Sequence, residues 1–126
     1  MAPRCLIVDD SDHFREAARR LLDADGIAVV GEASTVAETL DRYSELRPDV
    51  VLIDIDLGEE CGFDLARKLV DAAAGGPPCV VMISAYDEQD FAEMIAASPA
   101  IAFLSKLDLS GAAIREILRV AAGGRA

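Results

Sequence analysis

Residues 50–56 of the chain are Val-Val-Leu-Ile-Asp-Ile-Asp, and the rest of the sequence is organised around them. The first four of these residues are apolar and three of them are β-branched, which predicts a short strand buried on both faces. Asp54 follows at the point where this strand should leave the sheet. A carboxylate at the edge of an apolar core loses hydration unless another group pairs with it. The stretch therefore predicts a buried strand that ends in an aspartate with a partner elsewhere in the chain.

Further apolar runs predict more strands, and helical patterns separate them. The predicted strands cover residues 5–8, 27–30, 50–53, 79–83 and 101–104. From Phe14 onward, apolar residues recur at i, i+3, i+4, i+7 and i+8, which indicates a helix with one buried stripe that ends at Gly26. Strands that alternate with amphipathic helices imply a parallel sheet covered on both faces and joined by right-handed crossovers.

Local signals predict how several of the other elements begin and end. Thr35 and Glu38 fit a capping box, in which a hydroxyl and a carboxylate satisfy free amides at the start of a helix. A loop that contains Gly58 and Gly62 should lead into the next helix, and residues 75–78, Gly-Gly-Pro-Pro, predict a short break. A weaker helix should carry three apolar residues, Phe91, Met94 and Ile95.

Polar residues stand at the carboxyl ends of four predicted strands. They are Asp9 and Asp10 after the first strand, Asp54 after the third, Ser84 after the fourth and Lys106 after the fifth. In an open parallel sheet, ligands bind outside the carboxyl ends of the strands. The fold therefore predicts that these side chains converge on one site.

The residue types at this edge favour a particular chemistry. Crowded carboxylates repel one another and should hold a hard divalent cation, for which Mg²⁺ is the expected choice. A carboxylate is also a nucleophile toward phosphorus and gives an aspartyl phosphate. Such a transfer depends on positioning and on charge neutralisation, which a metal ion, a lysine and a hydroxyl can supply.

In order and spacing, these residues resemble those of receiver domains of two-component response regulators. The resemblance extends from Leu6-Ile7-Val8-Asp9-Asp10 through residues 49–54 and 82–85 to Phe103-Leu104-Ser105-Lys106. It implies an α/β fold with three layers, a doubly wound and flavodoxin-like parallel sheet of five strands in the order 2-1-3-4-5. Residues 1–126 would then form a single receiver domain.

The resemblance also implies a role for each residue at the site. Asp54 would be the phosphoacceptor, and Lys106 would pair with the phosphoryl group. Asp9 and Asp10 would hold Mg²⁺ together with Asp54 and the backbone carbonyl of Asp56. The domain would catalyse only its own phosphorylation and dephosphorylation.

Further residues would control the response to phosphorylation. By the same resemblance, Ser84 would move toward the phosphoryl group and Phe103 would be an aromatic switch, although a place in the ordinary core remains an alternative for Phe103. Asp56 and Tyr86 occupy positions that tune how long the phosphoryl group lasts. Leu107 departs from the family, in which a proline often follows the lysine.

Composition limits the other functions that the chain can have. Its 126 residues are 52% hydrophobic and carry a formal net charge of −11, which is typical of one globular domain and argues against binding nucleic acid or an anionic membrane. Its apolar runs are far shorter than the ~20 residues of a membrane span. The widely spaced Cys5, Cys61 and Cys79 favour buried, reduced thiols. We therefore expect a cytoplasmic protein.

The resemblance also implies partners. A histidine kinase would donate the phosphoryl group, and a downstream output domain or protein would detect it. The end of the chain is similar to receivers that precede a helix-turn-helix output domain. The sequence does not decide whether a homodimer forms through the fourth helix, fifth strand and fifth helix.

Two other functions are compatible with parts of the sequence. Asp54-Ile55-Asp56 resembles the nucleophile motif of haloacid-dehalogenase-type phosphatases, although the acidic pair here lies upstream of it. A flavodoxin-like cofactor carrier would share the fold, but residues 9–12, Asp-Asp-Ser-Asp, would repel a flavin phosphate.

Overall fold

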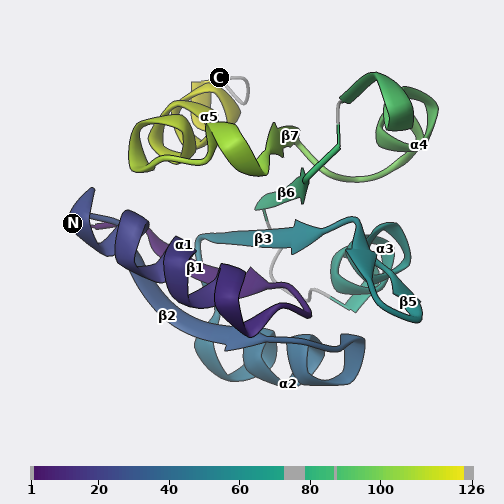
Figure 1. The fold of residues 1–126 in the computed structure, drawn as a ribbon, viewed down its shortest axis with the longest axis horizontal. Coiled ribbons are helices and arrows are strands. Elements are labelled where there is room, and N and C mark those ends of the chain that lie inside the picture. Colours follow the sequence, from purple (N-terminus) through teal and green to yellow (C-terminus); the bar gives the residue numbers. More distant parts are fainter. Residues whose placement is uncertain (1, 73–78, 87, 124–126) are drawn as a thin grey trace.

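The sheet of the computed structural model, which describes residues 2–72, 79–86 and 88–123, has five parallel strands in the order β2-β1-β3-β6-β7 (Figure 1). The strands are β1 (Arg4–Val8), β2 (Ala28–Ala33), β3 (Val50–Asp54), β6 (Cys79–Ser84) and β7 (Ala102–Ser105). Numbered along the chain, this order is 2-1-3-4-5, so the predicted fold class is confirmed. The expected break at residues 75–78 lies outside the described residues.

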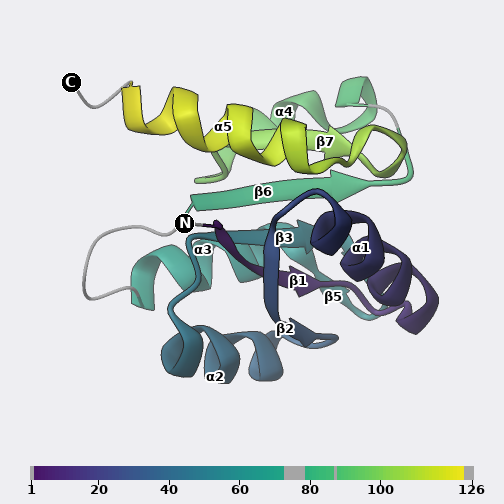
Figure 2. The ribbon, with the colours of Figure 1, turned by 90° about the vertical axis from the view of Figure 1, so that its left-hand side faces the viewer.

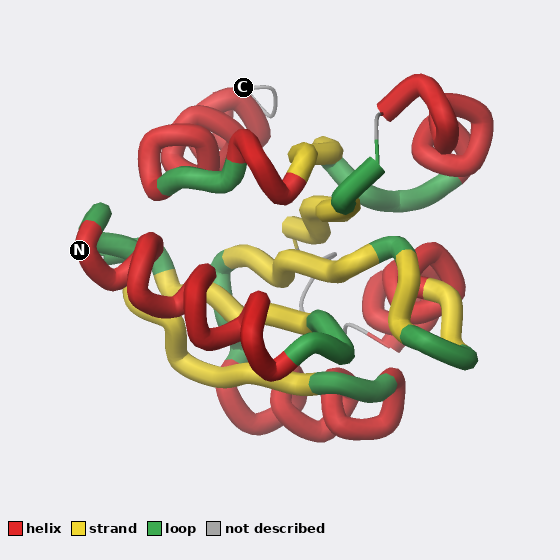
Figure 3. Tube along the Cα trace, in the orientation of Figure 1, coloured by secondary structure: helices red, strands yellow, loops and turns green. Residues whose placement is uncertain are grey.

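Helices cover both faces of this sheet. One face carries α1 (Asp12–Ala24) and α5 (Gly111–Gly123), and the other carries α2 (Val36–Leu46), α3 (Gly62–Ala72) and α4 (Ala92–Ala97) (Figure 2). The strands lie between these two groups of helices (Figure 3). Short 3₁₀ helices, η1 (Glu88–Phe91) and η2 (Lys106–Asp108), precede α4 and follow β7. Among the described residues, none of the helices combines the length and the apolar character that crossing a membrane requires.

Strand β3 is the centre of the core, as its sequence predicts. Its side chains alternate between two apolar clusters: Val51 and Ile53 pack with residues of α2 and α3, while Val50 and Leu52 pack with residues of α1 and α5. All four have no solvent exposure. Burial of such a side chain stabilises a fold by about 1.5–3 kcal/mol, so this strand fixes the position of Asp54 firmly.

Residues 56–61 correct the expectation of a plain loop. They form an antiparallel hairpin of β4 (Asp56–Leu57) and β5 (Glu60–Cys61), in which Asp56 pairs with Cys61. Gly58 turns the chain with a φ of +74°, a conformation that glycine adopts without strain. Strands of two residues are too short to show an alternating pattern, which is why the sequence did not reveal the hairpin.

The end of one strand and the burial of one side chain also differ from the sequence-based expectations. Strand β2 extends to Ala33, beyond the predicted end at residue 30, because Glu32 pairs with arginines of α1 and is therefore compatible with a strand. Met94 is 47% exposed, so the α4 region contributes only Phe91 and Ile95 to the core. A short helix has fewer turns to bury, and its apolar residues identify its inner face poorly.

The start of α2 confirms the Thr35 half of the capping box, while its Glu38 half is displaced by one residue. Thr35 Oγ1 accepts a hydrogen bond from the Glu38 amide, and the Glu38 carboxylate accepts one from the Ser34 amide. Glu60, from the hairpin, accepts a hydrogen bond from the Val36 amide at 3.0 Å. The hairpin that follows Asp54 is thus tied to the first turn of α2.

A second long-range contact joins α1 and α5. The Asp25 carboxylate accepts a hydrogen bond from the Gly111 amide at 2.8 Å, and Arg115 donates one to the Asp25 carbonyl. A Cβ at position 111 would lie 2.3 Å from the Asp25 Cβ, so the close approach requires glycine. The end of one helix therefore caps the start of the other.

Candidate functional site

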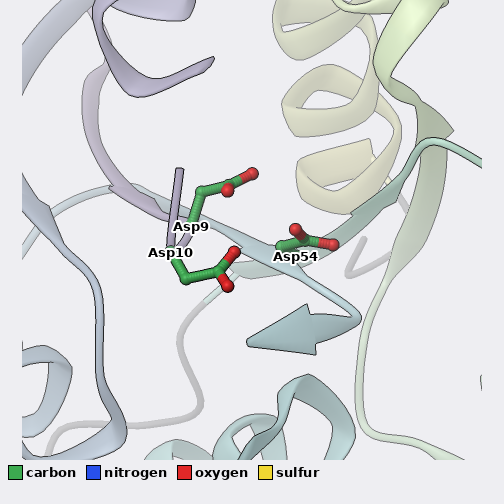
Figure 4. Close-up of side chains that lie close together, drawn as sticks. All are labelled: Asp9, Asp10 and Asp54. Carbon is green, nitrogen blue, oxygen red and sulfur yellow. The ribbon is translucent and has the colours of Figure 1, made fainter. Parts of the chain in front are cut away.

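The carboxyl ends of β1 and β3 bring three carboxylates together. Asp9 and Asp10 directly follow β1, and Asp54 is the last residue of β3. One carboxylate oxygen of each lies within 4.8 Å of the others. The three carboxyl groups turn toward the same space (Figure 4). The convergence that the sequence predicts for these three residues is therefore present.

Asp9 is fully buried, with no solvent exposure. Its Oδ1 accepts a hydrogen bond from the Ser11 amide at 2.8 Å. Its Oδ2 lies 2.7 Å from Lys106 Nζ as an ion pair, yet has no hydrogen bond of acceptable geometry from the part of the chain that the structure describes. A buried oxygen in this state has free capacity to bind a cation.

Asp54 is 6% exposed and shares the same lysine. Its Oδ2 accepts a hydrogen bond from Lys106 Nζ at 3.1 Å, and its Oδ1 accepts one from the Asp56 amide at 3.1 Å. Burial raises the pKa of Asp54 to about 6, and the charge of Asp9 acts in the same direction. The Asp56 amide and Lys106 oppose this rise without cancelling it.

Lys106 balances part of the negative charge. Burial lowers its pKa, but the contacts and charges of Asp9 and Asp54 outweigh that effect, so its pKa is raised and it remains an ammonium ion. Its Nζ also lies 4.3 Å from the centre of the Phe14 ring, in a cation–π contact. The sequence indicates Phe14 only as a core residue of the first helix.

Ser84 ends β6, the strand beside β3, and is 2% exposed. Its Oγ accepts a hydrogen bond from the Tyr86 amide at 3.0 Å. Tyr86 is 63% exposed, with its ring centre 6.3 Å from that of Phe91. Phe103 on β7 is partly buried and packs against the apolar cluster beneath α2 and α3. Ser84 therefore lies at the same edge of the sheet as Asp54, whereas the described contacts of Tyr86 and Phe103 are with Phe91 and with the apolar cluster.

The chain beyond Asp54 is shaped by Gly62. A Cβ on this residue would lie 2.1 Å from the Asp54 carbonyl oxygen, which no real structure allows. The Gly62 amide donates to the Ile55 carbonyl at 2.8 Å and closes the base of the hairpin. The exposed Asp56 side chain accepts a hydrogen bond from the Gly58 amide at 3.2 Å. Glycine at position 62 thus allows the hairpin to fold back over the end of β3.

The residues present fit a divalent cation. Carboxylate and carbonyl oxygens are the ligands that Mg²⁺ prefers, and three carboxylates with a single ammonium leave the site negatively charged. Asp54 lies beside this charge and is only 6% exposed. A cation bound here, together with Lys106, would neutralise charge on an incoming phosphoryl group, and Asp54 would present an oxygen to it.

Comparisons with known proteins agree with this chemistry. The family model described as the response regulator receiver domain matches residues 5–119, and the chain belongs to this family. It is a receiver domain of two-component signalling, and receivers of this family bind Mg²⁺ at an acidic pocket. The comparisons support this function over the phosphatase and the cofactor carrier.

Individual relatives are also response regulators. The chain is 33% identical over 117 residues to the response regulator GacA of Pseudomonas viridiflava, covering 92% of the chain and 52% of that protein. A LuxR-family response regulator from Aurantimonas sp. SI85-9A1 has a TM-score of 0.81 at 27% identity, covering 94% of this chain and 86% of that one. The signal receiver domain of the proposed response regulator NarL from Mycobacterium tuberculosis has a TM-score of 0.75 at 29% identity. This match covers 97% of this chain and 94% of that one. The chain spans about half the length of GacA.

Proposed function

We propose that Asp54 is the phosphoacceptor of this receiver and that the acidic cluster around it holds Mg²⁺. The observation that carries the proposal is the position of Asp54, a buried carboxylate that contacts Lys106 and lies beside Asp9 and Asp10. The metal ligands are the carboxylates of Asp9, Asp10 and Asp54 and the backbone carbonyl of Asp56. When bound, the ion neutralises charge on the phosphoryl oxygens.

The transfer is a displacement at phosphorus. An Asp54 carboxylate oxygen forms a bond to phosphorus, while the bond between phosphorus and the donor breaks and its electron pair leaves with the donor. Lys106 is placed to pair with a phosphoryl oxygen, because its ammonium already contacts Asp54 Oδ2. The Ser84 hydroxyl, whose oxygen accepts from the Tyr86 amide, can donate its own proton to another phosphoryl oxygen.

Phosphorylation then shifts an equilibrium between two conformations. Movement of Ser84 toward the phosphoryl group would release its contact with the Tyr86 amide and draw in the chain after β6. Phe103 would change its packing on the neighbouring strand. The amide of Asp56 contacts Asp54 and that of Tyr86 contacts Ser84, and the exposed side chains of these two residues would set the lifetime of the phosphoryl group.

The proposed donor is a histidine kinase, and the proposed reader of the switch is an output domain or a separate protein. Three exposed apolar residues support an interaction surface across α4, β7 and α5, where a homodimer would also form. They are Met94 (47% exposed), Ile101 (43%) and Val120 (57%).

The test is intact mass after incubation with acetyl phosphate and MgCl₂. Wild type should gain one phosphoryl group, and Asp54→Asn should gain none. Asp64→Asn, which changes an exposed aspartate on α3, is the matched control and should react as wild type. Omission of MgCl₂ should prevent the gain. An adduct that persists in Asp54→Asn would refute the assignment, and release of phosphate without an adduct would favour a phosphatase.

A further inference from the structure

The side chain of Arg15 on α1 makes an unusual set of contacts next to the acidic cluster. It is only 14% exposed. Its guanidinium donates to the backbone carbonyl of Asp9, to the Glu32 carboxylate at 3.2 Å and to Asp12. Arg15 therefore links α1, the end of β1 and strand β2 through one planar group.

These contacts complete the set of bonds around Asp9. The Asp9 amide donates to the Ala33 carbonyl at 3.1 Å, its Oδ1 accepts from Ser11, and its Oδ2 faces Lys106. The remaining polar group is the backbone carbonyl, which is buried with the rest of the residue and needs a donor. Arg15 supplies that donor, so the orientation of the Asp9 peptide depends on it.

Glu32 keeps the guanidinium in place from the opposite side. Its second oxygen accepts from Arg19 Nε at 2.8 Å, and Arg19 also donates to the Val29 carbonyl. Arg19 thus shares the Glu32 partner of Arg15, but its hydrogen bonds go to β2 and it makes none to Asp9. The two arginines lie one turn apart on the same helix, and of the two only Arg15 donates a hydrogen bond to Asp9.

We propose that Arg15 is a positioning residue that strengthens binding of the divalent cation. It fixes the orientation of the Asp9 peptide, and Glu32 anchors the Arg15 guanidinium. The proposal rests on the proposed function, since it takes the acidic cluster as the cation site. Outer partners that orient metal ligands typically change metal affinity by about 10- to 100-fold. The planar guanidinium of arginine carries several N–H donors and can bridge a carbonyl and a carboxylate, whereas a lysine ammonium does this poorly.

A role for Arg15 as a positive charge and a role in positioning Asp9 predict opposite changes in cation affinity when Arg15 is removed. If Arg15 acted only as a positive charge near the cluster, its loss would reduce repulsion and strengthen cation binding. If it positions Asp9, its loss weakens binding even though the site becomes more negative. Arg19→Met removes one positive charge from the same Glu32 network without removing a hydrogen bond to Asp9, so it is the matched control for the loss of charge.

The experiment is an NMR titration with MgCl₂ at constant ionic strength, following the amides of Ser11 and Asp56 in ¹⁵N-labelled protein. Arg15→Met should raise the Mg²⁺ Kd by about tenfold or more, while Arg19→Met should bind as wild type or more tightly. Arg15→Lys, which keeps the charge and the buried stem, should still bind more weakly than wild type.

The outcomes separate this inference from the proposed function. Wild-type or tighter binding by Arg15→Met overturns the positioning role. Equal weakening in Arg19→Met, with an equal loss in thermal unfolding temperature, would also overturn it, because the effect would then be a general loss of stability. If Arg15→Met does not fold, wild-type affinity in Arg15→Lys refutes the proposal. If the wild-type amides do not respond to MgCl₂, the cation site itself is wrong.

Discussion

At the scale of single residues, Asp54 is a carboxyl group whose pKa the fold raises well above its ordinary value. Its environment contains one buried carboxylate, Asp9, and one ammonium, Lys106. Burial and repulsion dominate, and its pKa rises from 3.8 to about 6. Without a cation, the ionised form of Asp54 is therefore a source of instability in the folded protein.

This shift gives a pH dependence with a definite sign. Because the folded-state pKa is raised, Asp54 contributes stability below its unfolded pKa, and that contribution is lost as the pH rises from about 4 through about 6. The loss is on the order of 2–3 kcal/mol. We expect urea unfolding in EDTA to show it as a fall in wild-type stability relative to Asp54→Asn across this range.

The comparison with Asp54→Asn cancels the titration of acidic groups that do not interact with Asp54. Its amide cannot ionise, so the contribution of Asp54, with its coupling to Asp9 and Lys106, remains in the difference. A difference that stays constant between about pH 4 and pH 7 would show that burial does not raise the pKa of Asp54.

At the scale of elements, the hairpin of β4 and β5 depends on the backbone at Gly62. We expect Gly62→Ala to lower the free energy of unfolding by about 3 kcal/mol or more, since its Cβ would lie 2.1 Å from a carbonyl oxygen of β3 and backbone must move. The displaced residue is Asp54, so phosphorylation by acetyl phosphate should fall as well. Chemical unfolding and intact mass measure the two effects.

Gly31→Ala is the matched control for this substitution. Its Cβ would meet the end of the flexible Leu46 side chain at 2.7 Å, which can rotate away. It should therefore cost less stability than Gly62→Ala and leave phosphorylation unchanged. Equal costs at the two glycines would contradict the clash with the β3 backbone.

The elements also show what sequence alone could establish. The buried run of β3, the helical stripe after Phe14 and the Thr35 half of the capping box come from local patterns, and the structure confirms them. Asp9, Asp10, Asp54 and Lys106 could be placed together because parallel strands end at one edge. The hairpin could not, because its strands have two residues each.

Contacts that depend on tertiary distance were likewise hidden. The Phe14 ring reaches Lys106 only because the start of α1 and the end of β7 lie at the same edge of the sheet. Glu60 binds the first turn of α2, which is 24 residues earlier in the chain. No local pattern marks such partners, since the residue types alone are typical of a core ring and a surface acid.

At the scale of the whole molecule, the net charge of −11 makes stability sensitive to ions. Added NaCl should raise the thermal unfolding temperature by screening self-repulsion. MgCl₂ at equal ionic strength should raise it further, because binding to the folded state alone adds stability. Differential scanning calorimetry measures both effects.

Asp10→Asn separates bound ions from screening. Asp10 is exposed, so its substitution leaves the core intact while it removes one of the three carboxylates. The response to NaCl should remain, and the extra response to MgCl₂ should shrink. An undiminished MgCl₂ response in this variant would exclude Asp10 as a ligand.

The contact between Asp25 and Gly111 has a consequence for how the chain is assembled. It joins residues 86 positions apart, and Ile114, in the first turn of α5, completes the apolar cluster under α1. On a ribosome, nearly the whole domain must emerge before that face of β6 and β7 is covered. From the synthesis of β6 until α5 has emerged, the nascent receiver thus exposes an apolar sheet face, and such transiently exposed surface is prone to aggregation.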